Sequence, residues 1–566
     1  MSNLSQKKRE KMLEYLNRLK EIHKDDESRM ALEKIETALT EKKYGLVWEE
    51  HEEEVDKQLV HNIPVFKEVE ERKIVADESN DFNFLLEGDN LHSLKLLEKT
   101  HKGKIDVIYI DPPYNTGNKD FIYNDSYVAT DDGYRHSKWL SFMNERLKIA
   151  KELLSDEGVI FISINDNEYA QLKLLCDDVF GENNYIENFI WIKNATKNLS
   201  KTTSTNHEYI ICYCKNIEKV SDKQKFRIQK EGYYEAITLV KECKRRKISV
   251  SETQKKLRKL YKEHSEWKGI SMYNFVDDNY EIFRSSDLSA PKSTGKANVY
   301  EVIHPVTNKI CKEPSRGWLY SYDKMREYIQ KDRILFGKDE TIVPSFKRFL
   351  KDVETEVRKS IITNFQDGKK ELKKIFGESP FPNPKTITLI FDILSTFEKE
   401  IVILDFFAGS GTTGHAVIQL NKEDGGNRKY ILCTNNENNI CEKITYQRMK
   451  NIQEELPHNL KYYKTEFIPK LSKDEEILSS KLLDYIKELV ELENMCEIDG
   501  KSRKIILTDE ELEDALKETE ESATLYIPSF VLIDGETRKE LSNKNIEIVD
   551  IPDYYFMEEL REVNEI

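Results

Sequence analysis

The sequence feature that most constrains the fold is a series of short runs that are almost entirely apolar. Residues 105–110 (IDVIYI), 158–164 (GVIFISI), 401–404 (IVIL) and 430–433 (YILC) are of this kind. Such runs are typical of strands that are buried on both faces, as in a parallel sheet. A further short strand is predicted at 82–86, and helical spacing appears at 91–97 and 139–154. This alternation predicts an α/β fold wound from parallel units.

The alternation is interrupted in the middle of the chain. Residues 191–375 mix basic helical stretches, as at 241–262, with loops rich in serine, threonine, asparagine and tyrosine, and the α/β pattern resumes at 376–450. The simplest account is one α/β domain that carries a large α+β insert. We therefore divide the chain into an N-terminal helical arm (1–60), the two halves of the α/β domain (61–190 and 376–466), the insert (191–375) and a small C-terminal α+β domain (467–566).

The two ends of the chain carry simpler patterns. In the arm, apolar residues from Met12 to Ile22 recur at helical spacing, and the other face is charged. This helix is either a solvated arm or a contact between two copies of the chain, and we expect a homodimer. In the C-terminal domain, residues 524–533 and 546–551 are predicted strands.

The charge is distributed unevenly along the chain. The formal net charge is −16, which by itself argues against a nucleic-acid partner. Residues 191–375, however, hold 40 lysines and arginines against 25 aspartates and glutamates, a local charge of +15, so the rest of the chain carries −31. A basic middle between acidic ends suits a surface that faces phosphates. A solvated, charge-rich helical surface explains the same pattern equally well.

Several classes of protein are excluded or disfavoured by composition. No run of 18 or more apolar residues is present, and the N-terminal residues lack the apolar core of a signal peptide, so we expect a cytoplasmic protein. The eight cysteines are scattered, without two pairs at metal-site spacing. We expect buried, reduced thiols and no metal site.

The first motif with chemical meaning follows the apolar run at 105–110. Asp111-Pro112-Pro113-Tyr114 stands where ligands bind in open parallel sheets, at the carboxyl end of a strand. The two prolines fix the backbone and remove amide donors, so that carbonyl acceptors remain. Asp111 adds an anionic acceptor and Tyr114 an aromatic face. The alternative interpretation is an ordinary proline turn after a strand.

This set of groups suits methylation of the exocyclic amine of adenine. That amine is a poor nucleophile because its lone pair is delocalised into the ring. Asp111 and the Pro112 carbonyl can each accept one of its N–H bonds, which frees the lone pair and stabilises the positive charge that grows as the methyl group arrives. Tyr114 can stack on a base that has been rotated out of the duplex. The same geometry also serves the exocyclic amine of cytosine.

The second motif is a glycine turn after the apolar run at 401–404, with the sequence Asp405-Phe406-Phe407-Ala408-Gly409-Ser410-Gly411-Thr412-Thr413. Glycines between a strand and a helix allow a ligand to approach the backbone, and a helix N-terminus favours an anion. No Gly-Lys-Ser/Thr follows, which excludes a Walker loop. A methionine moiety, with its carboxylate near the helix, is a suitable ligand. The alternative is a turn that only permits tight packing of helix and strand.

Two further elements are weaker signals. Residues 381–386 (FPNPKT) precede a predicted helix and are either a capping turn with a surface lysine or part of a binding site. Asp89 follows the strand at 82–86 and is either a helix cap or a ligand for an adenine amine.

Together, these motifs resemble the β-group of amino-methylating DNA methyltransferases. In that group Asp-Pro-Pro-Tyr precedes Phe-x-Gly-x-Gly, a circularly permuted motif order, and a target-recognition region lies between them. Here Asp111 precedes Gly409 by nearly 300 residues, and the basic insert lies between the two. The closer similarity is to the modification subunits of type III restriction–modification systems, over most of residues 40–450. It is carried by residues 44–49 (YGLVWE), 86–91 (LEGDNL), 111–117 (DPPYNTG), 206–210 (NHEYI) and 316–318 (RGW).

The resemblance implies a Rossmann-like methyltransferase domain that uses S-adenosylmethionine, with roles for individual residues. Trp191 and Lys193 stand where the family has a residue that packs near the flipped base. One departure is that Glu437 lies a few positions beyond the strand at 430–433, where many relatives have the acidic residue that binds the ribose hydroxyls; Glu437 is equally suited to cap the next helix. The implied catalytic residues are Asp111, Pro112, Pro113 and Tyr114, and the implied cofactor residues are Asp89, Asp111, Phe381, Lys385, Asp405, Phe407, Gly409, Gly411 and Thr412.

The function that the resemblance implies is N6-adenine methylation of double-stranded DNA at a specific site. It also implies a helicase–nuclease restriction subunit as partner. The alternatives are a solitary DNA methyltransferase, a cytosine-N4 methyltransferase, an RNA or protein methyltransferase, and a non-catalytic specificity subunit. The basic insert favours DNA, and the intact Asp111, Pro112, Tyr114 and Gly409 argue against a non-catalytic role.

Overall fold

The computed structural model of this chain describes residues 4–23, 25–40, 48–76, 80–117, 122–123, 126–193, 203–222, 226–291, 298–363, 367–470, 478–518, 523–529, 531–552 and 555. Most of the predicted family stretch at 44–49 lies outside these residues.

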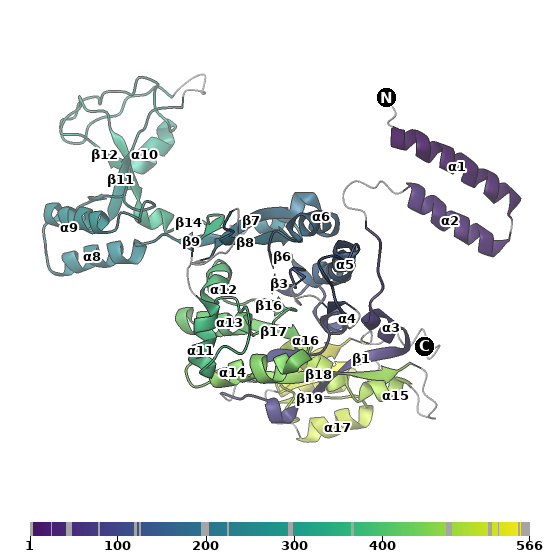
Figure 1. The fold of residues 1–566 in the computed structure, drawn as a ribbon. Helices are drawn as coiled ribbons and strands as arrows, with labels where there is room; N and C mark the ends of the chain where they lie inside the picture. Colours follow the sequence, from purple (N-terminus) through teal and green to yellow (C-terminus); the bar gives the residue numbers. More distant parts are fainter. Residues whose placement is uncertain are drawn as a thin grey trace. The chain divides into compact units, whose positions relative to one another are not determined.

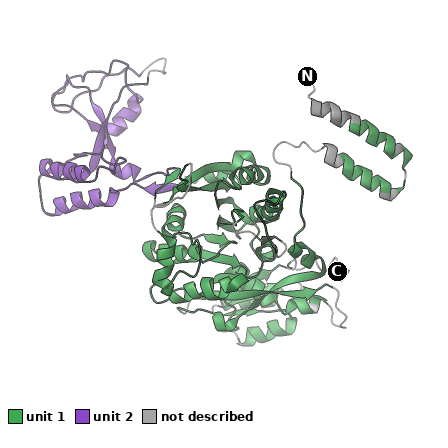
Figure 2. Ribbon diagram, viewed as in Figure 1, with its two compact units in different colours: residues 1–223, 360–566 green, residues 224–359 purple. Residues whose placement is uncertain are grey.

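The chain forms two compact units (Figure 2). Unit 1 comprises residues 1–223 and 360–566, and unit 2 comprises residues 224–359. Unit 2 is narrower than the predicted insert of 191–375, because residues 207–214 form a strand of the main sheet of unit 1. Each unit has its own buried apolar core.

Unit 1 is built on a ten-stranded sheet with the order β1-β18-β2-β17-β16-β3-β6-β8-β7-β15 (Figure 1). All of its strands run in one direction except β1 and β8. The four runs that were predicted as buried parallel strands are the central neighbours β17, β16, β3 and β6, which confirms the α/β prediction. The strands are β1 (Asn62–Glu68), β2 (Asn83–Glu87), β3 (Ile105–Ile110), β6 (Leu154–Ile164), β7 (Tyr185–Ile192), β8 (His207–Cys214), β15 (Ile361–Ile362), β16 (Val402–Asp405), β17 (Lys429–Thr434) and β18 (Leu460–Pro469).

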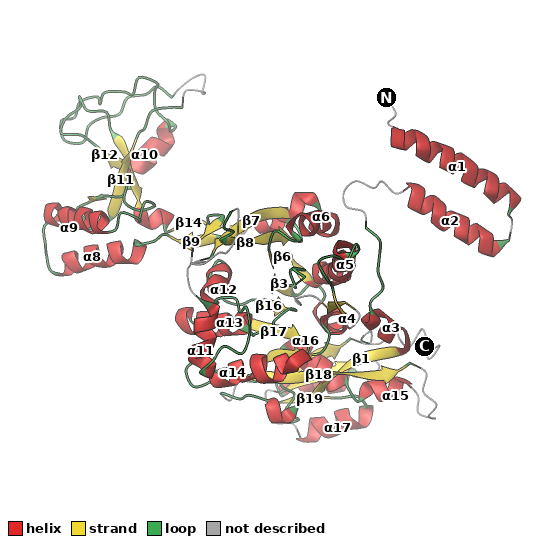
Figure 3. Cartoon of the chain, in the orientation of Figure 1, coloured by secondary structure: helices red, strands yellow, loops and turns green. Residues whose placement is uncertain are grey.

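The helices of unit 1 pack in groups along this sheet (Figure 3). α4, α5 and α6 pack side by side, and their apolar residues share one core with Ile108 and Ile110 of β3. α12 packs on α13, and α11 contacts α14. The helices are α3 (Glu54–His61), α4 (Asn90–His101), α5 (Arg135–Leu153), α6 (Tyr169–Phe180), α7 (Ile217–Asp222), α11 (Gly368–Phe376), α12 (Ile387–Leu394), α13 (Thr412–Asp424) and α14 (Gln447–Asn451), and a short hairpin is formed by β4 (Ile122–Tyr123) and β5 (Ser126–Tyr127).

The N-terminal residues are helical, as predicted. α1 (Leu4–Ile22) and α2 (Asp26–Thr40) pack on each other. Leu16 and Leu32 are buried in this contact, whereas Met12 and Ile22 are exposed. The apolar stripe of α1 is therefore only partly covered by α2.

Unit 2 contains two long helices and a small sheet. α8 (Tyr233–Arg245) and α9 (Val250–Glu263) pack on each other, so the helical stretch predicted at 241–262 is in fact two helices. The break occurs because Ser249 caps α9, with its hydroxyl accepting from the Glu252 amide. The other elements are α10 (Tyr322–Gln330), the antiparallel sheet of β10 (Phe275–Val276), β11 (Ile282–Ser286), β13 (Ser345–Phe349) and β12 (Ile334–Leu335), and the pair β9 (Arg227–Gln229) and β14 (Thr355–Val357).

The C-terminal residues carry a second, small parallel sheet with the order β19-β20-β21. The strand predicted at 524–533 ends at Pro528, and the one predicted at 546–551 is β21. The elements are α15 (Leu478–Leu483), α16 (Ile486–Asn494), β19 (Arg503–Ile505), α17 (Asp509–Glu518), β20 (Thr524–Pro528), α18 (Gly535–Asn543) and β21 (Glu547–Ile551).

Three findings bear on the compositional expectations. All eight cysteines are buried free thiols. Among the described residues, no helix is long and apolar enough to cross a membrane. Within the same part of the chain, no cluster of three or more histidine, cysteine, aspartate or glutamate residues is arranged to hold a metal ion.

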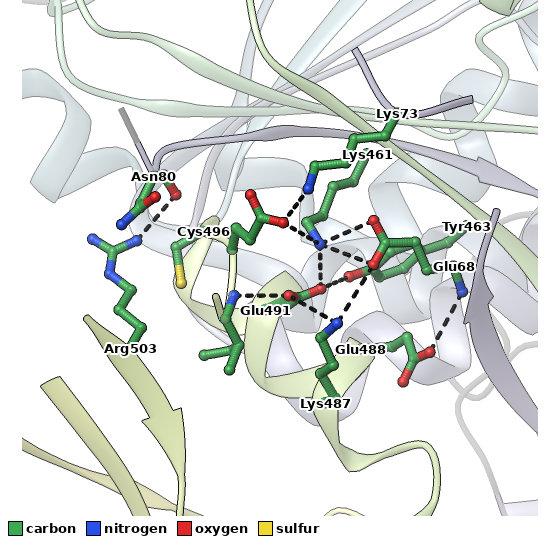
Figure 4. A network of polar contacts seen from close by, with 12 residues as sticks. Glu68, Lys73, Asn80, Lys461, Tyr463, Lys487, Glu488, Glu491, Cys496 and Arg503 are labelled. Atoms are coloured by element: carbon green, nitrogen blue, oxygen red, sulfur yellow. Dashed lines mark hydrogen bonds and ion pairs between the residues drawn. The ribbon is translucent and has the colours of Figure 1, made fainter. Parts of the chain in front are cut away.

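A buried ion network joins α16 to the edge of the main sheet (Figure 4). Lys461 of β18 is fully buried, and its ammonium lies 2.9 Å from Glu68 of β1 and 2.7 Å from Glu491 of α16. Tyr463 donates to the same Glu491 carboxylate, whose other oxygen accepts from the Ile498 amide at 2.8 Å. A buried ion pair is costly to break because the remaining charge keeps its desolvation penalty. Lys461 therefore holds α16 in a defined place on the sheet.

We predict that Lys461→Met destabilises unit 1 by about 3–5 kcal/mol, because it removes the cation in direct contact with two buried carboxylates. Only the half-exposed Lys487, 3.9 Å from each carboxylate, then remains among the described residues. The midpoint of chemical denaturation measures the change. Lys67→Met is the matched control, since that lysine lies on the neighbouring strand, is 58% exposed and has only a distant carboxylate at 3.9 Å. Equal midpoints for the two variants would contradict the assigned role.

Candidate active site

The two predicted motifs meet because their strands are neighbours. β3 and β16 pair in parallel, with Val107 opposite Ile403 and Ile108 opposite Leu404. Their carboxyl ends therefore lie side by side, and Asp111 and the glycine turn after β16 share one edge of the sheet. Asp89 follows β2 at the same edge, two strands away from β16. Ligands bind at this edge in open parallel sheets.

The Asp-Pro-Pro-Tyr loop is clamped by α5. The indole Nε1 of the buried Trp139 donates to the Pro113 carbonyl at 2.7 Å. Asn115, which directly follows the motif, has a positive φ of 55° and is buried. Its amide nitrogen donates to the Arg135 carbonyl at 3.1 Å and to the Glu168 carboxylate at 2.5 Å. These contacts fix the loop on the C-terminal side of its two prolines.

Glu168 is the buried acid behind this loop. Its side chain is fully buried, and one carboxylate oxygen contacts both Asn115 and the His136 Nδ1, the latter at 2.7 Å. Burial raises the pKa of Glu168 to about 8, against the opposing effects of the Asn115 hydrogen bond and the Arg135 charge. Glu168 was not predicted from the sequence. A single glutamate in a loop before a helix carries no signal of its own.

Asp111 lies in a cluster of charged groups. The Lys385 ammonium is 2.8 Å from Asp111 Oδ1 and 3.0 Å from Glu208 Oε2, and it donates to the Tyr114 hydroxyl at 2.6 Å. Glu208 also pairs with Lys193. Burial raises the pKa of Asp111, and the charge of Glu208 adds to this, whereas Lys385 opposes it. The two carboxylates together hold the pKa of Lys385 well above its usual range, despite burial.

Aromatic side chains surround this cluster. The Lys385 ammonium lies 4.9 Å from the centre of the Tyr114 ring and 5.9 Å from that of Trp191. The Tyr114 hydroxyl donates to Glu208 at 3.2 Å. Trp191 and Lys193, which were predicted near the flipped base, are thus placed at the same cluster. Glu208 lies in the family stretch 206–210, and that stretch is the sequence signal that points to it.

The glycine turn has the backbone geometry that only glycine adopts readily. Gly409 has φ +49° and Gly411 has φ +73°. A Cβ atom at Gly409 would lie 3.3 Å from the Phe381 ring, so the ring of the predicted element 381–386 lies directly over the turn. The Thr445 hydroxyl donates to the Gly409 carbonyl at 2.6 Å and fixes the turn from the other side.

Asp405 organises the start of the turn. Its two oxygens accept from the Phe407 amide at 3.0 Å and from the Thr413 hydroxyl at 2.5 Å. Burial raises the pKa of Asp405 to about 7, against the effect of these two hydrogen bonds. The Phe407 ring packs against Phe142 of α5, with ring centres 5.8 Å apart. Asp405 therefore ties the strand end to the first turn of α13.

Arg448 supports the turn from beneath and was also missed from the sequence. It is fully buried in α14, and its guanidinium donates to the Ser410 carbonyl at 3.0 Å and to the Thr412 hydroxyl at 2.9 Å. Burial lowers its pKa to about 10. The Thr412 hydroxyl in turn donates to the Lys385 carbonyl at 3.3 Å, which links the glycine turn to the loop that carries Lys385.

Asp89 caps α4, which was one of the two predicted roles. Its carboxylate accepts from the Leu91 amide at 2.7 Å, and its side chain is 32% exposed. The buried Arg146 lies 3.4 Å from it and is itself held by Glu53 at 2.7 Å. The cap leaves part of the carboxylate accessible at the sheet edge, so a ligand contact stays a prediction. The ribose contact of Glu437, which begins a short 3₁₀ turn after β17, also stays a prediction.

Comparison with known proteins places this site in a family. The sequence model of the DNA methylase family matches residues 105–447, a segment that contains Asp111, Lys385 and the glycine turn. The chain belongs to this family.

Individual relatives of this chain include Mod subunits of type III restriction-modification enzymes and a type II methyltransferase. The chain is 36% identical over 382 residues to the Mod subunit of the type III restriction-modification enzyme EcoP15I of Escherichia coli, which is 63% of this chain and 58% of that protein. It is 33% identical over 416 residues to the type III StyLTI Mod subunit of Salmonella typhimurium, again 58% of that protein. It is also 32% identical over 411 residues to the type II methyltransferase M.KpnI of Klebsiella pneumoniae, 90% of which is covered. The matched part of the chain thus spans less than two thirds of the two type III subunits.

The buried Glu168 makes stability depend on pH. Its folded-state pKa of about 8 lies above the ordinary value of 4.5, so the folded protein keeps a proton that the unfolded chain has released. Stability from this group is therefore complete below pH 4.5 and is lost as the pH rises to about 8. Between pH 5 and pH 9 the free energy of unfolding should therefore fall in the unsubstituted protein. We predict that in Glu168→Gln this fall is smaller by on the order of 3–5 kcal/mol.

Denaturant unfolding at the two pH values measures this difference. The exposed Glu182 supplies the control variant, Glu182→Gln, which should follow the unsubstituted protein. A Glu168→Gln profile parallel to that of the control would show that Glu168 is ionised throughout.

Proposed function

We propose that this protein transfers a methyl group from S-adenosylmethionine to the N6 amine of adenine in double-stranded DNA. The observation that carries the proposal is the parallel pairing of β3 with β16. It sets the acceptor groups of Asp111 and Pro112 beside the glycine turn at Gly409 and Gly411. The groups proposed to accept the N–H bonds of the target amine and the turn proposed to bind the cofactor thus lie at one edge of the sheet.

The residues at the glycine turn fit S-adenosylmethionine. A side chain at Gly409 would press on Phe381, and one at Gly411 would press on Thr445, so the two glycines leave the backbone open. Gly411 is also the N-cap residue of α13, and as a glycine it makes no side-chain hydrogen bond to the first turn of the helix. That helix N-terminus suits the cofactor's carboxylate. When bound, the cofactor supplies an electrophilic methyl group on a sulfonium. The residues proposed to hold it are Asp89, Asp111, Phe381, Lys385, Asp405, Phe407, Gly409, Gly411 and Thr412.

The acceptor groups prepare the amine for attack. Asp111 accepts one N–H bond of the target amine and the Pro112 carbonyl accepts the other, which localises the nitrogen lone pair. Asp111 also stabilises the positive charge that develops on the nitrogen. The raised pKa of Asp111 makes its carboxylate a suitable acceptor for the proton that the amine must lose. Tyr114, held by Glu208 and Lys385, offers its ring to the base.

Unit 2 is proposed as the part that recognises DNA. Residues 224–359 hold 30 lysines and arginines and 20 aspartates and glutamates, although the whole chain is acidic. In α9, Thr253, Leu257 and Tyr261 are buried, and the exposed Lys255, Lys259 and Lys262 lie on the other face. Lys259 lies 3.7 Å from Glu263 of the same helix. A row of exposed lysines on one helix face suits the phosphate backbone.

The biological setting follows from the relatives. Two of them are Mod subunits of type III restriction-modification enzymes, which supports the same role here, with a restriction subunit of the helicase–nuclease type as partner. The exposed Met12 and Ile22 of α1 support a homodimer through the N-terminal arm. Light scattering of the chain alone and with its restriction subunit tests both proposals.

The catalytic assignment predicts that Asp111→Ala lowers the rate of methyl transfer to duplex DNA by about 100- to 1000-fold, because the developing cation loses its anionic acceptor. Incorporation of labelled methyl groups measures the rate, with RNA and protein as parallel substrates. Asp156→Ala, at an exposed position of β6, is the control. Unchanged incorporation in Asp111→Ala would refute the assignment. Single-molecule sequencing of the methylated DNA identifies the base and the recognised sequence.

The proposed DNA face predicts the behaviour of Lys255→Ala/Lys259→Ala/Lys262→Ala. DNA affinity should fall equally for recognised and unrelated sequences, because phosphate contacts carry no sequence information. The slope of log affinity against log salt should decrease by about 2–3. Titration of fluorescent duplexes at several salt concentrations provides the measurement. A slope equal to that of the unsubstituted protein would exclude this face of α9 from the DNA interface.

A further inference from the structure

The Lys385 ammonium lies against Asp111, the carboxylate proposed to accept the target amine. Its three N–H bonds are directed to three oxygens, those of Asp111 at 2.8 Å, Glu208 at 3.0 Å and Tyr114 at 2.6 Å. A methylated exocyclic amine has the same form, a tetrahedral nitrogen with a positive charge beside Asp111. Lys385 therefore stands in for the product of the chemical step, in the absence of the base.

This arrangement conflicts with amine methylation as proposed above. Asp111 shares its charge with Lys385, so it is a weaker acceptor for the amine. A cation at this distance from Asp111 also repels the positive charge that develops on the amine nitrogen. Both effects oppose the transition state, so Lys385 has to leave Asp111 before the methyl group is transferred.

We propose that the target base displaces Lys385 from Asp111 when it binds. The lysine then stays paired with Glu208. This inference rests on the proposed function and assigns Lys385 and Glu208 as positioning residues for it. In the free protein the lysine keeps the two carboxylates neutralised. Once the base has entered, Glu208 holds the lysine away from the reacting nitrogen.

Glu208 is suited to receive the lysine. Its side chain is only 10% exposed and lies on β8, directly opposite Trp191 of β7. It already pairs with Lys193, which follows β7 and hydrogen-bonds through its backbone to Asn206. The lysines lower the pKa of Glu208 below its ordinary value in spite of burial, so the carboxylate stays charged. Lys385 thus moves between two fixed anions and is not released to solvent.

The pH dependence of catalysis distinguishes displacement from a static ion pair. The pH profile of kcat/KM reports the free enzyme, and that of kcat reports the complex with substrate. If the base displaces Lys385, the lysine lowers the pKa of Asp111 in the free protein but not in the complex with DNA. Lys385→Met should therefore shift the acid limb of kcat/KM to higher pH and leave the acid limb of kcat in place. The titratable groups that face Asp111 are Lys385, Glu208, Tyr114, Tyr109 and Asp405, with Lys193 beyond Glu208.

A double-mutant cycle tests the role of Glu208. Glu208→Gln removes the charge that holds the displaced lysine, so displacement by the base becomes less favourable. KM for DNA should therefore rise about tenfold or more, which corresponds to the loss of one hydrogen bond to a charged group. In Lys385→Met/Glu208→Gln no ammonium has to be displaced, and most of this rise in KM should disappear. Additive effects of the two substitutions would show that Glu208 acts on DNA independently of Lys385.

The experiment uses the full chain and a duplex that contains the sequence mapped by methylation. Lys373→Met, at an exposed position of α11, is the matched control, and thermal melting checks that each variant is folded. Equal shifts of both acid limbs would show that Lys385 stays on Asp111 and would overturn the inference, as would lower rates with no shift at all. If the unsubstituted protein methylates no DNA, the proposed function itself fails, and the inference with it. The two failures are thus distinguishable.

Discussion

The parallel pairing of β3 with β16 is the contact on which the site depends. The chain between these strands is nearly 300 residues long and includes all of unit 2, yet the register of Val107 with Ile403 sets both strand ends to the same height. Each strand end then carries one half of the site. Trp139 and Asn115 fix one loop against α5, and Thr445 and Arg448 fix the other, so non-covalent contacts hold each half of the site in place.

Buried charges recur in unit 1, and each has a defined set of partners. Lys461 and Arg146 are fully buried and join elements that are distant in sequence. Such pairs contribute little net stability compared with apolar packing, because desolvation offsets the attraction. They do penalise every arrangement that leaves one charge alone. The loops at the sheet edge are therefore held by directional contacts, whereas the sheet itself is held by apolar burial.

The sequence was informative where burial alone decides the structure. The four apolar runs became the four central strands, because a strand covered on both faces leaves no position for polar side chains. Asp111 and Gly409 were recognisable because they stand at strand ends within unusual sequences. Glu168, Glu208 and Arg448 were not assigned, because an isolated acid or arginine acquires its role only from the groups that folding brings to it. The break between α8 and α9 was missed because one capping serine outweighs a continuous helical pattern. The predicted insert of 191–375 is longer than unit 2, because β8 pairs with β6 in the main sheet although it follows a loop-rich stretch.

The pairing of β9 with β14 has a consequence for how such proteins diverge. These strands lie at the beginning and the end of unit 2 and run antiparallel, with Arg227 opposite Val357, so the chain enters and leaves the unit at neighbouring points. A segment with adjacent ends can be replaced or resized without opening the structure that carries it. Unit 2 is thus organised as a cassette. On the proposed role of unit 2 in DNA recognition, exchange of this cassette would change the recognised sequence in one event, while the strands that hold Asp111 and the glycine turn keep their register.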